Sequence, residues 1–166
     1  EVLNTIPTAE GAIQIAMEEL PITIHGANCL VTGFGRVAKT LCDRLKALGA
    51  NVTACARKYA DLAWIKTLGY NAISIPALEH SVSNFDVVFN TIPCVVLTEK
   101  VLSKLKKDCL VVDLASRPGG VDFEIAGRIG IKTVWALSLP GKVAPLTAGA
   151  IIKDTILNII AEEGLR

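Results

Sequence analysis

The stretch CLVTGFGRVAKTLCDRLKALGANV, residues 29–52, constrains the fold of this chain more than any other. An apolar run typical of a buried strand leads into a glycine-rich turn, then into helical periodicity, then into a second apolar run. The helix is expected to turn four apolar side chains inward: Val37, Leu41, Leu45 and Leu48. This order predicts a strand, helix and second parallel strand.

The turn Gly33-Phe34-Gly35-Arg36-Val37-Ala38 has the pattern of a turn that binds the phosphates of a dinucleotide. Gly33 permits the tight turn, Gly35 lets the backbone approach a pyrophosphate, and Ala38 lets the helix pack closely on the strand. Free N–H groups at the helix N-terminus attract the phosphates. We therefore expect cofactor contacts from Gly33, Phe34, Gly35, Arg36 and Val37, although a turn that serves only packing is the alternative.

The tip of the second strand indicates which dinucleotide binds. Ala56 lies 21 residues after Gly35, where a carboxylate would accept hydrogen bonds from an adenosine ribose, and Arg57 and Lys58 follow it. A missing acid and two added cations favour a 2'-phosphate, so the sequence predicts NADP, with NAD less favoured. The alternative is that Arg57 and Lys58 are solvated surface charges. Arg36 can cover the pyrophosphate or be an ordinary exposed helix-start residue.

Six strand-like runs alternate with helical segments along the chain, and two of them, CLVVDLA and DVVFNTI, are continuously apolar. Such runs are typical of a parallel sheet that is covered on both faces. We predict an α/β fold, a doubly wound parallel six-stranded sheet of Rossmann type with order 3-2-1-4-5-6. One domain is expected over residues 1–166, with a core at 24–143, a leading helix at 8–20 that Thr8 caps, and a closing helix at 144–163. Both terminal helices are expected to pack side by side on the body as a hinge.

Composition limits the function classes. The 166 residues are 51% apolar with a formal net charge of +1, which argues against the broad basic surface of a nucleic-acid-binding protein. The five cysteines form no C-x-x-C pair and there are two histidines, so we expect no metal site and a reduced, cytoplasmic protein. No run is long enough to span a membrane. Because residue 1 is Glu, a fragment of a longer protein is expected.

Three other strand ends are expected to build the cleft, since ligands of such sheets bind beyond the carboxyl ends of strands. They are residues 90–93 (NTIP), 113–120 (DLASRPGG) and 137–145 (LSLPGKVAP). Expected cofactor contacts there are Asn90, Thr91, Ile92, Pro93, Leu114 and Ala115. Substrate contacts are expected from Ser116, from Arg117, which can orient a carboxylate, and from His25; shaped turns and surface charges are the alternatives. Cys94 lies beside the cleft without an identified base, and no catalytic acid or base emerges.

The motifs NTIPTAEGAIQIA, TIHG, GFGRVA, NTIP, DLASRPGGVDF and LPGKVAPLTAG together resemble the dehydrogenase-like A subunits of dipicolinate synthase, over nearly the whole chain. The resemblance implies an NAD(P)-dependent dehydrogenase domain within a longer subunit, whose separate N-terminal domain this chain lacks. That subunit works with a second, flavoprotein-like subunit. It would oxidise dihydrodipicolinate or its hydrated precursor to dipicolinate during sporulation, within an oligomer. Residues 116–119 are then the candidate dicarboxylate side. A 2-hydroxyacid or shikimate-type dehydrogenase and a non-catalytic NAD(P)-sensing module are the alternatives.

Overall fold

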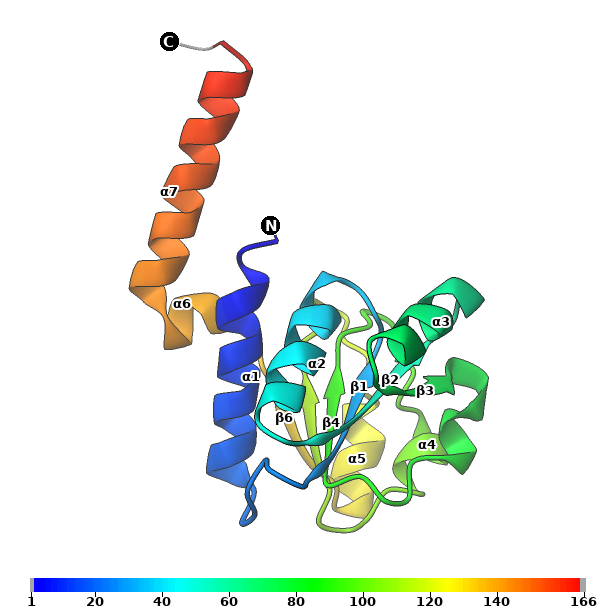
Figure 1. The fold of residues 1–166 in the computed structure, drawn as a ribbon. Coiled ribbons are helices and arrows are strands. Elements are labelled where there is room, and N and C mark those ends of the chain that lie inside the picture. Colours follow the sequence, from blue (N-terminus) through cyan, green and yellow to red (C-terminus); the bar gives the residue numbers. More distant parts are fainter. Residues whose placement is uncertain (1, 165–166) are drawn as a thin grey trace.

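A single twisted sheet of six parallel strands forms the centre of the protein, in a computed structural model that describes residues 2–164 (Figure 1). The strand order is β3-β2-β1-β4-β5-β6, as the apolar runs predicted. The strands are β1 Asn28–Thr32, β2 Asn51–Ala56, β3 Asn71–Ser74, β4 Val87–Asn90, β5 Leu110–Asp113 and β6 Lys132–Trp135. The order reverses between β1 and β4, so the fold has the switch point at which such sheets bind ligands.

Helices cover both faces of this sheet. The helices in chain order are α1 Thr5–Glu19, α2 Arg36–Ala47, α3 Tyr59–Thr67, the 3-10 helix η1 Ile75–His80, α4 Glu99–Leu102, α5 Phe123–Ile129, α6 Leu139–Val143 and α7 Pro145–Glu162. Strand residues alternate between the two layers: Val31 packs in the core with α1, α2 and α3, whereas Leu30 packs in the core with η1, α4 and α5. Two apolar layers therefore hold the strand ends in place.

Two details of the first helices differ from the sequence-based expectation. Helix α1 begins at Thr5 after Asn4, so Thr8 lies inside the helix, where its hydroxyl donates to the Asn4 carbonyl at 2.7 Å. In α2 the buried residues are Ala38, Leu41, Cys42 and Leu45, whereas Val37 is half-buried and Leu48 is exposed. Leu48 lies outside the inward face because it is the C-cap residue, where the helix ends.

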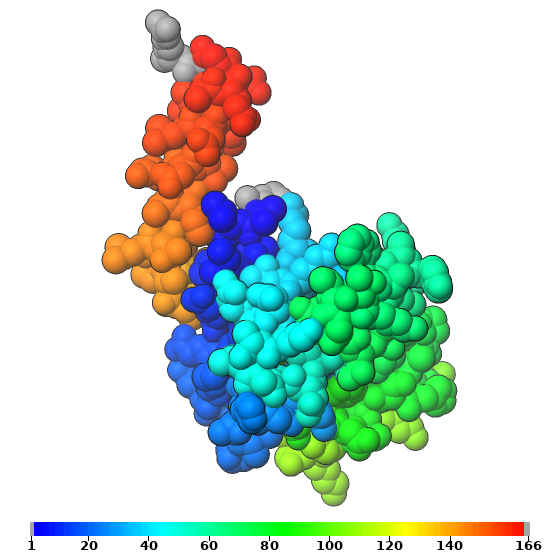
Figure 2. All heavy atoms as spheres, in the orientation of Figure 1, coloured from blue at the N-terminus to red at the C-terminus, as the bar shows by residue number. Residues whose placement is uncertain are grey.

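The expectation that the closing helix packs on the body is wrong. Helix α7 leaves the domain and projects into solvent (Figures 1 and 2), and its exposed apolar residues are Leu146, Ile152, Ile156, Leu157, Ile159 and Ile160. The short helix α6 packs on α1, and α7 follows it and contacts α6. Only the start of α7, with Ala148 buried, contacts α6. The sequence therefore predicted this helix correctly but not what it packs on, and the six exposed residues form the apolar stripe of α7.

Candidate functional site

The carboxyl ends of β1, β4 and β5 lie side by side because of the sheet register. Thr32 pairs with Asn90, and Asn90 pairs with Asp113. The residues after each strand therefore meet at one edge: residues 33–36 after β1, 91–96 after β4, and 114–120 after β5. This edge holds the glycine turn and two of the three other strand ends singled out in the sequence.

The turn after β1 has the geometry that a phosphate-binding turn needs. Gly33 adopts φ +95°, and a Cβ there would overlap the Thr91 hydroxyl. Gly35 is the N-cap residue of α2, is exposed, and has open space where a Cβ would lie. The first N–H groups of this 12-residue helix thus face a region that a pyrophosphate can approach without steric conflict.

A cleft of about 490 Å³ opens beside this turn. It is lined by Gly33, Phe34, Ala56, Arg57, Asp61, Ile75, Ile92, Cys94 and Val96. Five of these were predicted as cofactor contacts, and they come from the ends of β1, β2 and β4. Sequence reasoning missed Asp61, Ile75 and Val96, since each follows its strand and carries no motif. The cleft is the place that a dinucleotide would occupy.

Opposite charges meet at the β2 end of the cleft. Arg57 and Lys58 are exposed, and within residues 2–164 neither forms an ion pair. Asp61, half-buried in the first turn of α3, lines the same cleft as Arg57. Two cations and one carboxylate leave a net positive charge there, and the N-terminus of α3 adds a further positive dipole end.

Behind the cleft lies a buried polar network that the sequence did not reveal. Asn90 is fully buried; its side-chain oxygen accepts a hydrogen bond from the Thr32 hydroxyl at 2.6 Å. Its amide nitrogen donates to the Ile92 carbonyl at 3.0 Å and to Asp113 Oδ1 at 2.7 Å. The network joins the ends of the three central strands. The Asn90 side chain therefore braces this edge of the sheet.

The other candidate residues are placed as follows. Thr91 and Leu114 are half-buried, Ala115 is buried, and Lys58, Pro93, Ser116 and Arg117 are exposed. None of these lines the cleft itself. The loop 114–120 follows β5, two strands away from β1, so it lies beyond the cleft on the side of β4 and β5. Ser116 and Arg117 thus lie at the edge of the sheet where ligands of such folds bind.

Two of the expected site segments lie away from the cleft. His25 precedes β1 and packs against Gly49 in the turn before β2, so it lies at the amino-terminal edge of the sheet, opposite the cleft. Residues 137–145 do not line the cleft either, because most of them fold into α6 and pack on α1. In both cases the sequence offered a suitable type of residue, but only the fold shows where the chain places it.

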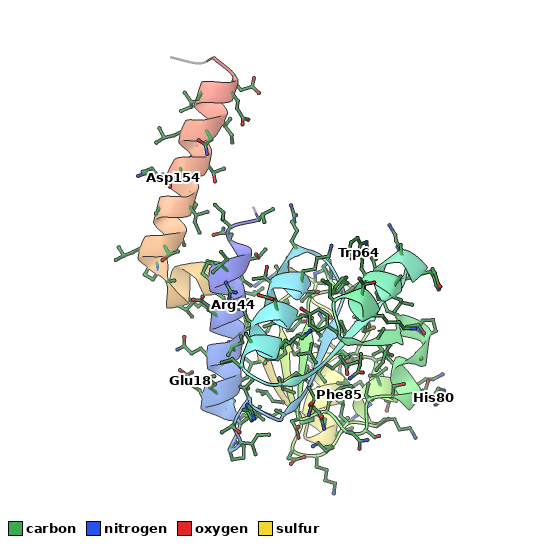
Figure 3. All side chains as sticks on the ribbon, viewed as in Figure 1. Glu18, Arg44, Trp64, His80, Phe85 and Asp154 are labelled. Atoms are coloured by element: carbon green, nitrogen blue, oxygen red, sulfur yellow. The ribbon has the colours of Figure 1, made fainter. Side chains whose placement is uncertain are left out.

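A larger groove of about 600 Å³ lies elsewhere, between α1 and α2. Met17 and Leu48 line it together with Glu18 and Arg44, which Figure 3 labels on the two helices. It shares no residue with the glycine turn. Among the described residues, no three His, Cys, Asp or Glu side chains gather as a metal site, and no helix there has the length and apolarity needed to cross a membrane.

Comparison with known proteins agrees with this geometry. A family model described as "Putative NAD(P)-binding" matches residues 20–126. The A subunit of dipicolinate synthase from Bacillus subtilis (strain 168) is 43% identical over 161 residues, which are 97% of this chain and 54% of that protein. The chain therefore spans about half the length of this relative.

Two solved structures are similar to nearly the whole chain. The A subunit of dipicolinate synthase from Bacillus halodurans has a TM-score of 0.94 and 42% identity, covering 96% of this chain and 55% of that one. The corresponding chain from Bacillus subtilis has a TM-score of 0.95 and 43% identity, covering 97% and 54%. The resemblance seen in the motifs is thus confirmed. The chain belongs to the NAD(P)-binding family, as its glycine turn, its cleft and the family match together show.

Proposed function

We propose that this chain is the NADP-binding domain of an oxidoreductase that converts dihydrodipicolinate, or its hydrated precursor, to dipicolinate in spore formation. The observation that carries the proposal is the end of β2, where Ala56 and Arg57 line the same cleft as the Gly33 turn. The names of the similar proteins support the substrate. The activity of a whole enzyme is part of the proposal, since the chain matches about half of those proteins.

Preference for NADP follows from the charges at this strand end. An adenosine 2'-phosphate beside Ala56 meets no carboxylate at the strand tip, and the Arg57 guanidinium can grip it with two parallel hydrogen bonds. Lys58 adds a more solvated charge. The Asp61 carboxylate in α3 would repel the phosphate. The attraction of Arg57 and Lys58 must therefore exceed this repulsion.

The remaining residues position the reactants. Bound NADP⁺ supplies the hydride acceptor. The α2 N-terminus and Gly35 hold the pyrophosphate, and Ile92 and Phe34 provide an apolar wall. Arg117 in the loop after β5 is the candidate group that orients a substrate carboxylate. Equal dipicolinate affinity in the wild type and in Arg117→Ala would contradict this last role.

A partner and a compartment complete the proposal. The similar proteins are each named as one subunit of a synthase, which supports a second subunit that works with this chain. All five cysteines are free thiols, and thiols of this kind suit the reducing cytoplasm.

Calorimetric titration of NADP⁺ and NAD⁺ tests the cofactor assignment. Arg57→Ala should raise the Kd for NADP⁺ by roughly 10- to 150-fold, the equivalent of about 1.5 to 3 kcal/mol, and leave the Kd for NAD⁺ unchanged. Ala56→Asp should shrink or invert the preference by adding repulsion against the phosphate and a ribose contact. Arg128→Ala removes an exposed arginine from the other face of the sheet and is the matched control. Equal wild-type affinities for the two cofactors at low salt would contradict the proposal.

A further inference from the structure

We propose that Asp113 is a positioning residue: its carboxylate holds the loop 114–120 in the shape that presents Ser116 and Arg117 to a dicarboxylate. The inference rests on the proposed function, because it concerns the substrate side of the same site. Neither the sequence motif nor the residues that line the cleft indicate this role for Asp113, the last residue of β5.

The carboxylate of Asp113 is fully buried and uses both oxygens. Oδ1 accepts hydrogen bonds from the Ala115 N–H at 3.0 Å and from the Asn90 amide at 2.7 Å. Oδ2 accepts from the Gly120 N–H at 2.8 Å. Two of the three donors are therefore backbone groups near the two ends of one loop, and the third belongs to β4. One side chain thus fixes both ends of the loop to the neighbouring strand.

The loop fits this carboxylate closely. A Cβ at Gly120 would overlap the Asn90 amide and the Ile92 carbonyl, so the backbone lies directly against the network. Such a close approach leaves few alternative paths for the loop while the carboxylate remains. Between the two anchored ends, Ser116 and Arg117 are exposed. Within residues 2–164 neither side chain forms an ion pair, so their position follows from the anchored ends of the loop.

Trp135 provides a second, weaker anchor for the same loop. Its indole N–H donates to the Ala115 carbonyl at 3.1 Å, and its ring stacks on Phe123 with centroids 5.1 Å apart. Trp135→Phe would keep an aromatic ring and remove this hydrogen bond. It therefore loosens the loop less than a change at Asp113 would.

The test compares Asp113→Asn with Asp86→Asn and Trp135→Phe in the same chain. An Asn at 113 places an NH₂ group against one of the three donors, so the loop loses an acceptor without losing volume. Asp86 is the matched control: it also accepts a backbone N–H, from Asn28 at 2.7 Å, but at the opposite edge of the sheet. The measurements are calorimetry with NADP⁺, calorimetry with dipicolinate added to the NADP⁺ complex, and hydrogen exchange of residues 113–122.

In Asp113→Asn the Kd for dipicolinate should rise roughly tenfold, while the Kd for NADP⁺ stays within about threefold of wild type. Exchange of the Ala115 and Gly120 amides should accelerate. Trp135→Phe should raise the dipicolinate Kd by about threefold. Asp86→Asn should leave both affinities unchanged.

Unchanged dipicolinate affinity in Asp113→Asn overturns the inference, and so does an equal weakening of both ligands, which marks a purely structural role. If Asp113→Asn does not fold, unchanged dipicolinate affinity in Trp135→Phe overturns it instead. A wild-type chain that binds no NADP⁺ or no dipicolinate contradicts the proposed function. In that case hydrogen exchange alone tests whether Asp113 anchors the loop. Faster exchange confined to the loop in Asp113→Asn supports the anchor, and unchanged exchange there overturns it.

Discussion

The five cysteine thiols differ sharply in their surroundings. Cys29, Cys42, Cys55 and Cys109 are fully buried, and burial raises the pKa of each thiol to about 12. At neutral pH they hold their protons and are poor nucleophiles. Cys94 is exposed and lines the cleft.

We expect one thiol of the five to react with Ellman's reagent in the native chain, and the other four only after unfolding in denaturant. Bound NADP⁺ should slow the native reaction, because Cys94 shares its cleft. Cys94→Ser should abolish the fast phase and serves as the control. Fast reaction of two or more thiols in native buffer would contradict the burial of the other four.

At the same residue scale, the candidate site was only partly visible in the sequence. Ala56 and Arg57 could be identified because the spacing from the glycine turn to the next strand tip is local and regular. Asp113 lies in an equally visible motif, but its role depends on the β4–β5 register and on the backbone path up to Gly120. His25 failed for a related reason: it precedes β1, and the cleft lies beyond the other end of that strand.

At the scale of elements, the end of the sheet opposite the cleft is held by an ion pair. Asp86 accepts the Asn28 N–H at the start of β1 and pairs with Lys106. Partial burial acts to raise the pKa of Asp86, but hydrogen bonds from Lys106 and Asn28 outweigh it, so the pKa lies below its usual value. The contribution of the folded carboxylate to stability is present above the ordinary Asp pKa and is lost as pH falls through the lowered value.

Asp86→Asn should therefore lower the Tm at pH 7. The difference in Tm between the variant and the wild type should become smaller as the pH falls below about 4. Thermal unfolding of both proteins at a series of pH values measures this. Asp108→Asn, which changes an exposed acid two residues after Lys106, is the control and should show a smaller difference in Tm. A difference in Tm that stays constant down to strongly acidic pH would mean that ionisation of Asp86 contributes nothing to the stability of the fold.

The elements themselves were largely predictable. All six strands were found because buried parallel strands are short apolar runs bounded by turn residues. The start of α1 was misplaced because Thr8 is of a residue type that favours the N-cap, whereas the structure begins the helix at Thr5. Helix α6 was missed because Pro140 and Gly141 resemble turn residues, whereas in the fold Pro140 lies in the first turn of a helix.

At the scale of the whole molecule, α7 decides the shape. Its 18 residues extend for about 27 Å at roughly 1.5 Å per residue, mostly away from the domain. A globular chain of this size has a radius of gyration of about 15 Å. The projecting helix should raise the measured value in small-angle scattering above that figure.

Scattering over a dilution series measures this, and truncation after residue 144 is the control, which should return the radius of gyration to that of a globular domain. The dilution series separates the shape of one chain from association through the apolar stripe. A radius of gyration near the globular value for the full chain at low concentration would show that α7 folds back onto the body.

The cleft and the apolar stripe of α7 are formed by different parts of the sequence. Every residue that lines the cleft lies between Gly33 and Val96, and the buried anchor of the β5 loop ends at Gly120. The stripe on α7 begins only after Pro145. Substitutions on the exposed face of α7 can therefore accumulate without altering the cleft, and the converse also holds. The domain is modular along its length, so the surface of α7 and the residues of the cleft are free to diverge at different rates.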